Sequence, residues 1–193
     1  MTDPRQITLD DVLGPAKALG SAGVLAKIRR REAGKAAEAH GRIGEAEVAR
    51  LCTAAREHHV ARLEQIATPT RGRNGRRRFA AKSIVDFLGF LMDGTGRVVA
   101  IEVKTTAEGE ALALARVDEH QREYLDTVLS AGGIALLAAV FGEPVGNMLL
   151  RLRTYVVPWA DVCARTRVTE GQLLAAGCLT GPEDFLLPYL TTP

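Results

Sequence analysis

The sequence predicts an α/β fold in which a central mixed β-sheet is flanked by helices. Two apolar runs, at residues 82–92 and 98–104, are separated by a Gly-containing turn at 93–96, which indicates a β-hairpin. A helical repeat of apolar residues follows at 117–130. Residues 134–141 are then almost uniformly apolar, which is typical of a strand covered on both faces.

The sequence of the N-terminal part predicts a helix and a strand. Residues 1–40 are polar and contain Gly and Ala, and we expect an extension that is partly helical and partly mobile. From Arg42 to His59, apolar residues recur at three- and four-residue spacing, which predicts an amphipathic helix. Residues 60–66 predict a short strand, and the Gly- and Arg-rich segment at about 67–82 predicts an exposed basic loop or projection.

The C-terminal part completes a domain that we expect to span residues 41–193. The helix at 117–130 should end at Gly132-Gly133. Residues 148–157 predict a further strand, and short helices should follow Pro158, one of them with Thr169 as its N-cap. A length of 193 residues fits one such domain, which would bury roughly 70% of the surface of its unfolded chain.

Composition favours a cytoplasmic protein without a membrane span. The longest apolar stretch is far shorter than the about 20 residues that a membrane-spanning helix needs, and no secretory signal is visible. Cys52, Cys163 and Cys178 form no Cys-x-x-Cys pair of the kind that suggests a zinc, iron–sulfur or redox centre.

Three charged residues of the predicted hairpin form a candidate site. Asp86 interrupts the first apolar run, and Glu102-Val103-Lys104 lies in the second. Since strand side chains alternate, Glu102 and Lys104 share a face, and Asp86 can meet them from the neighbouring strand. A bare Glu-x-Lys triplet is commonly a structural ion pair. Asp86 beside it favours a site for a hard divalent cation instead, because buried charges need a partner or a metal.

Such a site suits the cleavage of a phosphodiester bond. Asp86 and Glu102 would supply carboxylate ligands, and the backbone carbonyl of Val103 would be a natural third ligand. Lys104 could orient or deprotonate the attacking water, or stabilise the charge that develops on the phosphate, and the residues alone leave these roles open.

A basic segment lies next to this site in the sequence. Between Gln65 and Val85 there are six basic residues and no acidic one, so the remaining 19 basic residues face 23 acidic residues, and the rest of the chain carries a charge of −4. A basic run is often a solvated face or a disordered loop. Beside a metal-type acid cluster it favours binding to nucleic acid. The six residues are Arg71, Arg73, Arg76, Arg77, Arg78 and Lys82.

These features together resemble a known family. Asp86 followed by Glu102-Val103-Lys104 is similar to the PD-(D/E)XK nuclease signature. The chain more specifically resembles RecU-type Holliday junction resolvases, from about residue 41 through most of its length. The segments that carry this resemblance are Gly41-Arg42-Ile43-Gly44-Glu45, residues 66–70, Val117-Asp118-Glu119-His120-Gln121 and Gly132-Gly133-Ile134.

The resemblance implies a restriction-endonuclease-like fold and assigns roles to residues. Asp86 and Glu102 would bind Mg²⁺ or Mn²⁺, and Lys104 would be the catalytic lysine. Glu45 would reach the metal side directly or through water, and Gln121 would contact phosphate or water; an exposed helix residue is the alternative for each. His120 is expected to lie on the helix surface or to pack, because Mg²⁺ prefers oxygen ligands.

The resemblance also implies a homodimer that nicks opposing strands of a four-way DNA junction, with the basic projection entering the junction. The chain departs from the family pattern at two places: the projection looks short, and Ile84-Val85 stand before Asp86 where small hydroxyl residues are usual. Two alternatives therefore stay open. One is a nuclease of the same fold acting on other DNA in repair or restriction, and the other is a non-catalytic DNA-binding module.

Overall fold

The computed structural model describes residues 9–67, 70–73, 76–79 and 83–176, with four further residues near the C-terminus: Phe185, Leu186, Pro188 and Leu190. Side chains are described from residue 23 onwards, except within 68–82. The chain divides into two units, residues 1–38 and 39–193, which we describe separately. The described helices include none with the length and apolarity of a membrane span.

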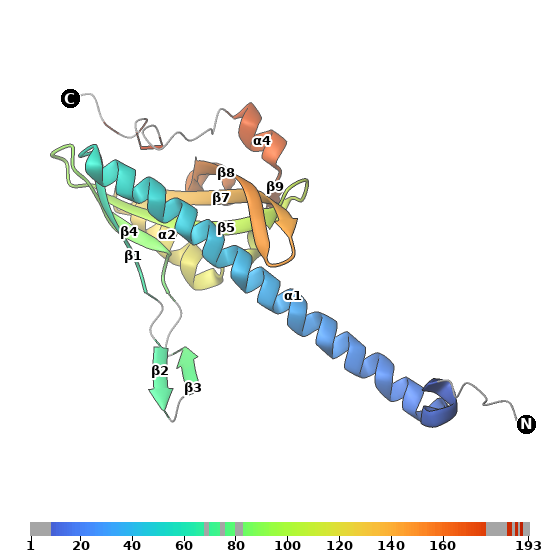
Figure 1. Ribbon diagram of the computed structural model, residues 1–193. Coiled ribbons are helices and arrows are strands. Elements are labelled where there is room, and N and C mark those ends of the chain that lie inside the picture. Colours follow the sequence, from blue (N-terminus) through green and yellow to red (C-terminus); the bar gives the residue numbers. More distant parts are fainter. Residues whose placement is uncertain are drawn as a thin grey trace, which may run out of the picture. The chain divides into compact units, whose positions relative to one another are not determined.

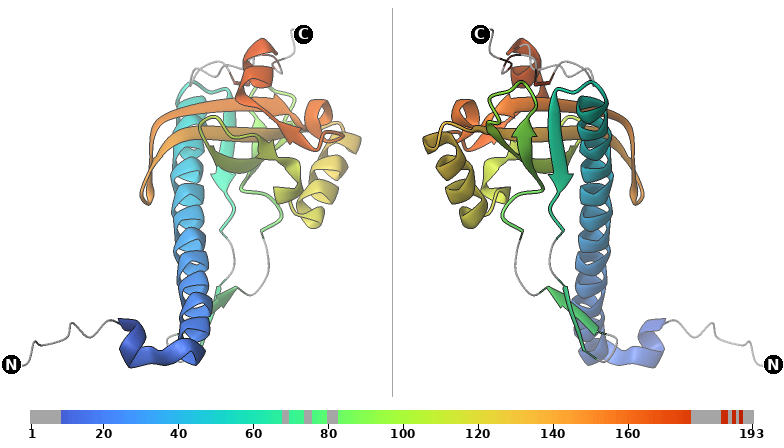
Figure 2. Two further views of the ribbon diagram at one scale, coloured as in Figure 1. Left: turned by 90° about the vertical axis from the view of Figure 1, so that its right-hand side faces the viewer. Right: turned by 90° about the vertical axis from the view of Figure 1, so that its left-hand side faces the viewer.

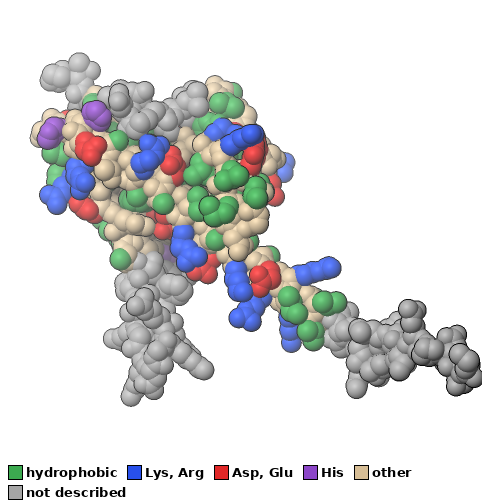
Figure 3. Space-filling model, in the orientation of Figure 1, with side chains coloured by type: hydrophobic (Ala, Val, Ile, Leu, Met, Phe, Trp, Pro, Cys, Tyr) green, Lys and Arg blue, Asp and Glu red, His purple; other side chains and the backbone are tan. Residues whose placement is uncertain are grey.

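The first unit is helical over all of its described residues. Helix α1 (Leu9–Glu57) begins here and continues into the second unit, so the expected partly helical extension is helical from Leu9 onwards (Figure 1). Val24, Leu25 and Ile28 are more than half exposed. Lys and Arg side chains cluster on this stretch of α1 in Figure 3, and residues 27–31 supply four of them.

The second unit is built on a mixed five-stranded sheet, as the sequence predicts. Its order is β1-β4-β5-β7-β8, and the pairing is antiparallel except between β5 and β7, which are parallel. A parallel neighbour requires a crossover, and helix α2 (Glu119–Ser130) lies in that connection. The strands are β1 (Ala61–Gln65), β4 (Phe87–Leu91), β5 (Val98–Ala107), β7 (Ile134–Val145) and β8 (Met148–Pro158).

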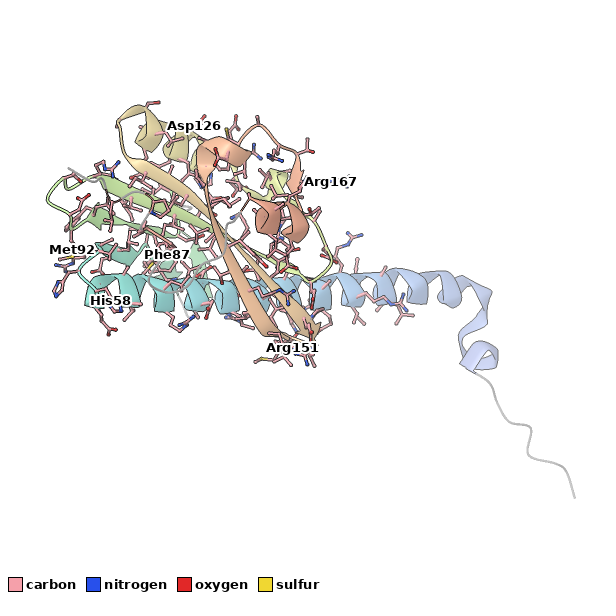
Figure 4. The ribbon with its side chains drawn as sticks, turned by 90° about the horizontal axis from the view of Figure 1, so that it is seen from above. His58, Phe87, Met92, Asp126, Arg151 and Arg167 are labelled. Atoms are coloured by element: carbon pink, nitrogen blue, oxygen red, sulfur yellow. The ribbon has the colours of Figure 1, made fainter. Side chains whose placement is uncertain are left out.

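Helices cover both faces of this sheet. On one face, Val48 and Leu51 of α1 pack against alternate residues of β5 and against Phe87, which is labelled in Figure 4. On the other face, Leu125 and Val128 of α2 belong to a second core cluster. Figure 2 shows the two helices on opposite sides of the strands. Residues 134–141 of β7 are all buried, which confirms that both faces of this strand are covered.

The predicted hairpin is the pair β4–β5, but its first strand is shorter than expected. The strand begins at Phe87, not at residue 82, and Asp86 therefore lies in an irregular segment before it. The connecting turn is held by Asp93, whose Oδ1 accepts a hydrogen bond from the Thr95 N–H at 2.9 Å. Gly94 and Gly96 have φ values of 88° and 64°, which favour glycine at both positions.

The basic projection is itself a hairpin. Strands β2 (Thr70–Arg73) and β3 (Arg76–Phe79) pair antiparallel and form a separate two-stranded sheet. The side chains of Arg71, Arg73, Arg76, Arg77 and Arg78, and the whole of Lys82, lie outside what the structure describes.

The short C-terminal helices are present as expected. They are α3 (Trp159–Val162) and α4 (Glu170–Ala175), and Thr169 caps α4 by accepting a hydrogen bond from the Gln172 N–H at 3.3 Å. The sequence did not predict the small sheet of β6 (Leu112–Ala113) and β9 (Arg167–Val168), because two-residue strands leave no periodic pattern. A 3₁₀ turn at Leu114–Arg116 follows β6.

Replacing Gly89 by Ala should destabilise the sheet. Gly89 lies on β4 opposite Leu63, and a Cβ at this position would come within 1.8 Å of the Arg62 carbonyl oxygen. We expect a loss of about 1–3 kcal/mol in the free energy of unfolding, because backbone atoms have to move apart. Chemical denaturation measures this loss.

The matched control is Gly171→Ala in α4, where no neighbouring atom lies within 4 Å of the added Cβ. This variant should be neutral or slightly stabilising, because Ala favours a helix. Equal stabilities of the two variants would show that β1 and β4 do not approach each other this closely.

Candidate active site

Glu102 and Lys104 lie on the same face of β5, as the alternation of strand side chains predicts. Ile101 and Val103 point to the opposite face, into the core cluster under α1. The Glu102 side chain is fully buried and that of Lys104 is 15% exposed, and Lys104 Nζ donates a hydrogen bond to Glu102 Oε1. A buried ion pair therefore lies on a central strand of the sheet.

Asp86 joins this pair from the segment before β4. Its N–H donates to the Ile101 carbonyl at 3.2 Å, and its own carbonyl accepts from the Ile66 N–H at 2.8 Å. The Val103 N–H donates to Asp86 Oδ2 at 2.7 Å. The backbone of both neighbouring strands thus fixes Asp86 with its carboxylate beside Glu102. Val103, predicted as a carbonyl ligand, contributes its N–H to this arrangement.

The two carboxyl groups share one proton when no cation is present. Burial raises the pKa of Glu102, Lys104 lowers it and the nearby Asp86 charge raises it, and the combined result is a pKa of about 8. Burial also raises the pKa of Asp86, against the lowering effects of the Val103 N–H and of Lys104. Like charges this close cannot both form at low cost, so the proton belongs to the pair.

One oxygen of the site lacks a donor. Glu102 Oε2 is buried and has no hydrogen-bond partner among the described residues. The neighbouring Asp86 carboxylate is itself an acceptor, so the two groups need a proton or a cation between them. The oxygen donors present fit a hard divalent cation. Within the described residues, however, no group of three His, Cys, Asp or Glu side chains could hold a metal, so the carboxylate set is the pair alone.

Gln121 links the site to helix α2. Its side chain is buried, and its Oε1 accepts hydrogen bonds from the Asp118 N–H at 3.0 Å and from Lys104 Nζ at 3.4 Å. The first bond is part of a capping box at the start of α2. The structure therefore places Gln121 beside Lys104 and not on the exposed surface of the helix.

Glu45 lies at the margin of the site. It is on α1, half-buried, and Gln65 Nε2 donates to its Oε2 at 3.0 Å. Burial and the Asp86 charge raise the pKa of Glu45, whereas Lys104 lowers it, so this carboxyl group lies within electrostatic range of both residues. The sequence did not single out Gln65, because a glutamine at the end of an edge strand carries no pattern of its own.

His120 packs against the segment that leads to Asp86. Its Nε2 lies 3.0 Å from the Ser83 carbonyl oxygen, and a carbonyl can only accept, so this nitrogen carries the proton. Of the two placements expected for His120, on the helix surface or packed, the structure shows the packed one.

Comparison with known protein families shows which family the chain belongs to. The family model described as RecU, Recombination protein U, matches residues 47–170. The chain belongs to the RecU family. A search of curated proteins found no match. Membership in RecU supports Holliday junction resolution in recombination and binding to DNA. The matched range contains Asp86, Glu102, Lys104 and Gln121, but it begins two residues after Glu45.

In this RecU chain, replacing Glu102 by Gln should reduce a pH dependence of stability. The pKa of about 8 in the folded state lies above the ordinary value of 4.5, so the cation-free folded state holds an extra proton between these values. The stability that the extra proton contributes is complete below about pH 4.5 and is lost as the pH rises to about 8, by on the order of 5 kcal/mol.

Urea denaturation at several pH values, with a chelator present, measures this decline. The neutral amide of Glu102→Gln should reduce this decline strongly, and only the contribution of Asp86 should remain. The same decline in the wild type and in the variant would show that Glu102 is not the group that holds the proton.

Proposed function

We propose that the chain is a metal-dependent endonuclease that resolves Holliday junctions by paired nicks. The observation that carries this proposal is the buried Glu102, whose Oε2 has no hydrogen-bond partner among the described residues and whose pKa is raised, beside Asp86 and Lys104. A purely structural ion pair would have no need of a second carboxylate that competes for the same proton. A site that binds a cation during the reaction would need the second carboxylate.

Asp86 and Glu102 would hold Mg²⁺, or Mn²⁺ in its place, with the Val103 carbonyl as a third ligand. These donors are all oxygens, which suit a hard cation better than zinc. When bound, the cation would stabilise charge on the phosphate and lower the pKa of a coordinated water. On binding, the proton shared by Asp86 and Glu102 would be released, since metal ligands must be deprotonated.

Lys104 would act on the phosphate or on the attacking water. An ammonium group has three hydrogens to donate, and two of those on Lys104 are donated to Glu102 and Gln121. The third would point to a phosphate oxygen or to the water. Glu45 would reach the metal side from α1, directly or through water. Gln121 would keep Lys104 in place.

The basic hairpin would supply the contacts to DNA. Arg71, Arg73, Arg76, Arg77, Arg78 and Lys82 concentrate positive charge where phosphates would bind. We propose that β2–β3 enters the junction and that a homodimer brings two sites to opposing strands. The cytoplasmic location expected from the cysteines fits this role.

Lys104→Met should abolish cleavage of synthetic four-way junctions in Mg²⁺. We expect a fall of at least about 100-fold in the cleavage rate with junction binding retained, because the variant loses the group that acts on the reacting phosphate or water and keeps the basic hairpin. Denaturing gels of end-labelled strands measure both nicks. Lys35→Met is the matched control, because Lys35 forms an exposed ion pair with Glu32 on α1.

Cleavage assays on flaps and duplexes, with Asp86→Ala as the active-site control, separate the alternative functions. Symmetric nicks at the crossover support a resolvase, whereas general degradation of flaps and duplexes would indicate another nuclease of this fold. DNA binding without cleavage, whichever divalent metal ion is added, would indicate a DNA-binding module and would contradict the proposal.

Replacing the five hairpin arginines by Gln should weaken junction binding and reduce its dependence on salt. Each phosphate contact that is lost lowers the slope of log K against log salt by about 1. Titrations at several salt concentrations, without a divalent cation, measure the slope. An unchanged slope would place the DNA contacts elsewhere.

A further inference from the structure

Helix α1 comes close to strand β5 at Gly44, the residue before Glu45. Gly44 is buried, and a Cβ placed on it would lie 2.0 Å from Thr105 Oγ1 and 3.2 Å from Thr105 Cβ. Thr105 follows Lys104 and is only 5% exposed. A residue larger than glycine would therefore displace the Thr105 side chain or push α1 away from the strand that carries Lys104.

This glycine is unfavourable for the helix itself. Glycine in a helix interior costs stability relative to Ala, so its presence at a crowded point indicates a packing requirement. Gly41, one turn earlier on α1, has no neighbouring atom within 4 Å of an added Cβ. The two glycines share a helix and differ in their surroundings, which makes Gly41 an internal control.

A second contact fixes the direction of the Glu45 carboxylate. Gln65 Nε2 donates to Glu45 Oε2 at 3.0 Å from the last residue of β1. The next residue, Ile66, donates its N–H to the Asp86 carbonyl at 2.8 Å. The end of β1 thus holds the backbone of Asp86 and the side chain of Glu45 at the same time.

We infer that Gly44 and Gln65 are positioning residues, which bring Glu45 to the reacting side of Asp86 and Lys104. This inference rests on the proposed nuclease function. Gly44 sets how far α1 stands from β5, and Gln65 sets where the carboxylate points. A carboxylate on a helix that moves outward by even 1 Å would lose its contact with the attacking water, and such a displacement can cost about 100-fold in rate.

The test compares Gly44→Ala with Gly41→Ala in the full chain. Gly44→Ala should lower the rate of junction cleavage by about 10–100-fold while the Kd for the uncut junction, measured without a divalent cation, stays within about twofold. Gly41→Ala should leave cleavage unchanged and raise the melting temperature by about 2–4 °C. Gln65→Ala should lower the cleavage rate in the same way as Gly44→Ala, with unchanged junction binding.

Three double variants separate positioning from a loss of folding. Thr105→Ala removes the hydroxyl that meets the new Cβ, so Gly44→Ala with Thr105→Ala should recover much of the melting temperature and of the cleavage rate. In a Glu45→Gln background, Gly44→Ala and Gln65→Ala should each lower the rate by no more than about twofold, because the group they position is already absent.

The outcomes distinguish this inference from the proposed function. If the wild type cleaves junctions and loses this activity with Lys104→Met, the proposed function stands. Full activity of Gly44→Ala or Gln65→Ala, or rate losses that multiply with that of Glu45→Gln, would then overturn the inference alone. A wild type that does not cleave in any metal would overturn both.

Discussion

The arrangement of this domain depends on a carboxylate that is completely buried on a central strand. Glu102 on β5 has neighbouring strands on both sides and is removed from water, which is costly for a charge unless a partner compensates it. Lys104 partly stabilises the charged form of Glu102 and lowers its pKa, whereas the Asp86 charge destabilises that form and raises the pKa. A second acid next to the first would only destabilise a structural ion pair. Together the two acids form a site whose charge is completed by a proton or by a cation.

The mixed sheet explains why the contributing residues converge. β5 pairs antiparallel with β4 on one side and parallel with β7 on the other, so the start of β4, the end of β1 and the start of α2 all lie near the same part of β5. Each supplies one group: Asp86, Gln65 and Gln121. Helix α1 adds Glu45 from the opposite face, next to the point where Gly44 lets the helix come close to Thr105 of β5.

The sequence predicted the sheet, its hairpin and the charged pair on β5, because these follow from alternation and apolar runs. It also predicted that Asp86 would reach Glu102, although it placed Asp86 inside a strand and the structure places it before one. Gln65 and the close approach at Gly44 could not be predicted. A contact between residues 44 and 105 depends on how a helix lies on a sheet, and local periodicity contains no information about that distance.

Gln121 has two functions that cannot be separated by removing it. Its Oε1 accepts from the Asp118 N–H, which helps to begin α2, and from Lys104, which helps to hold the lysine. A substitution that removes both bonds loosens the start of the helix and the lysine together, so a loss of activity there would not by itself reveal a role in the reaction. Glu45 and Gly44 are more informative, because the neighbouring Gly41 tests the helix without touching the site. For this site, variants on α1 therefore distinguish chemistry from folding better than variants on α2.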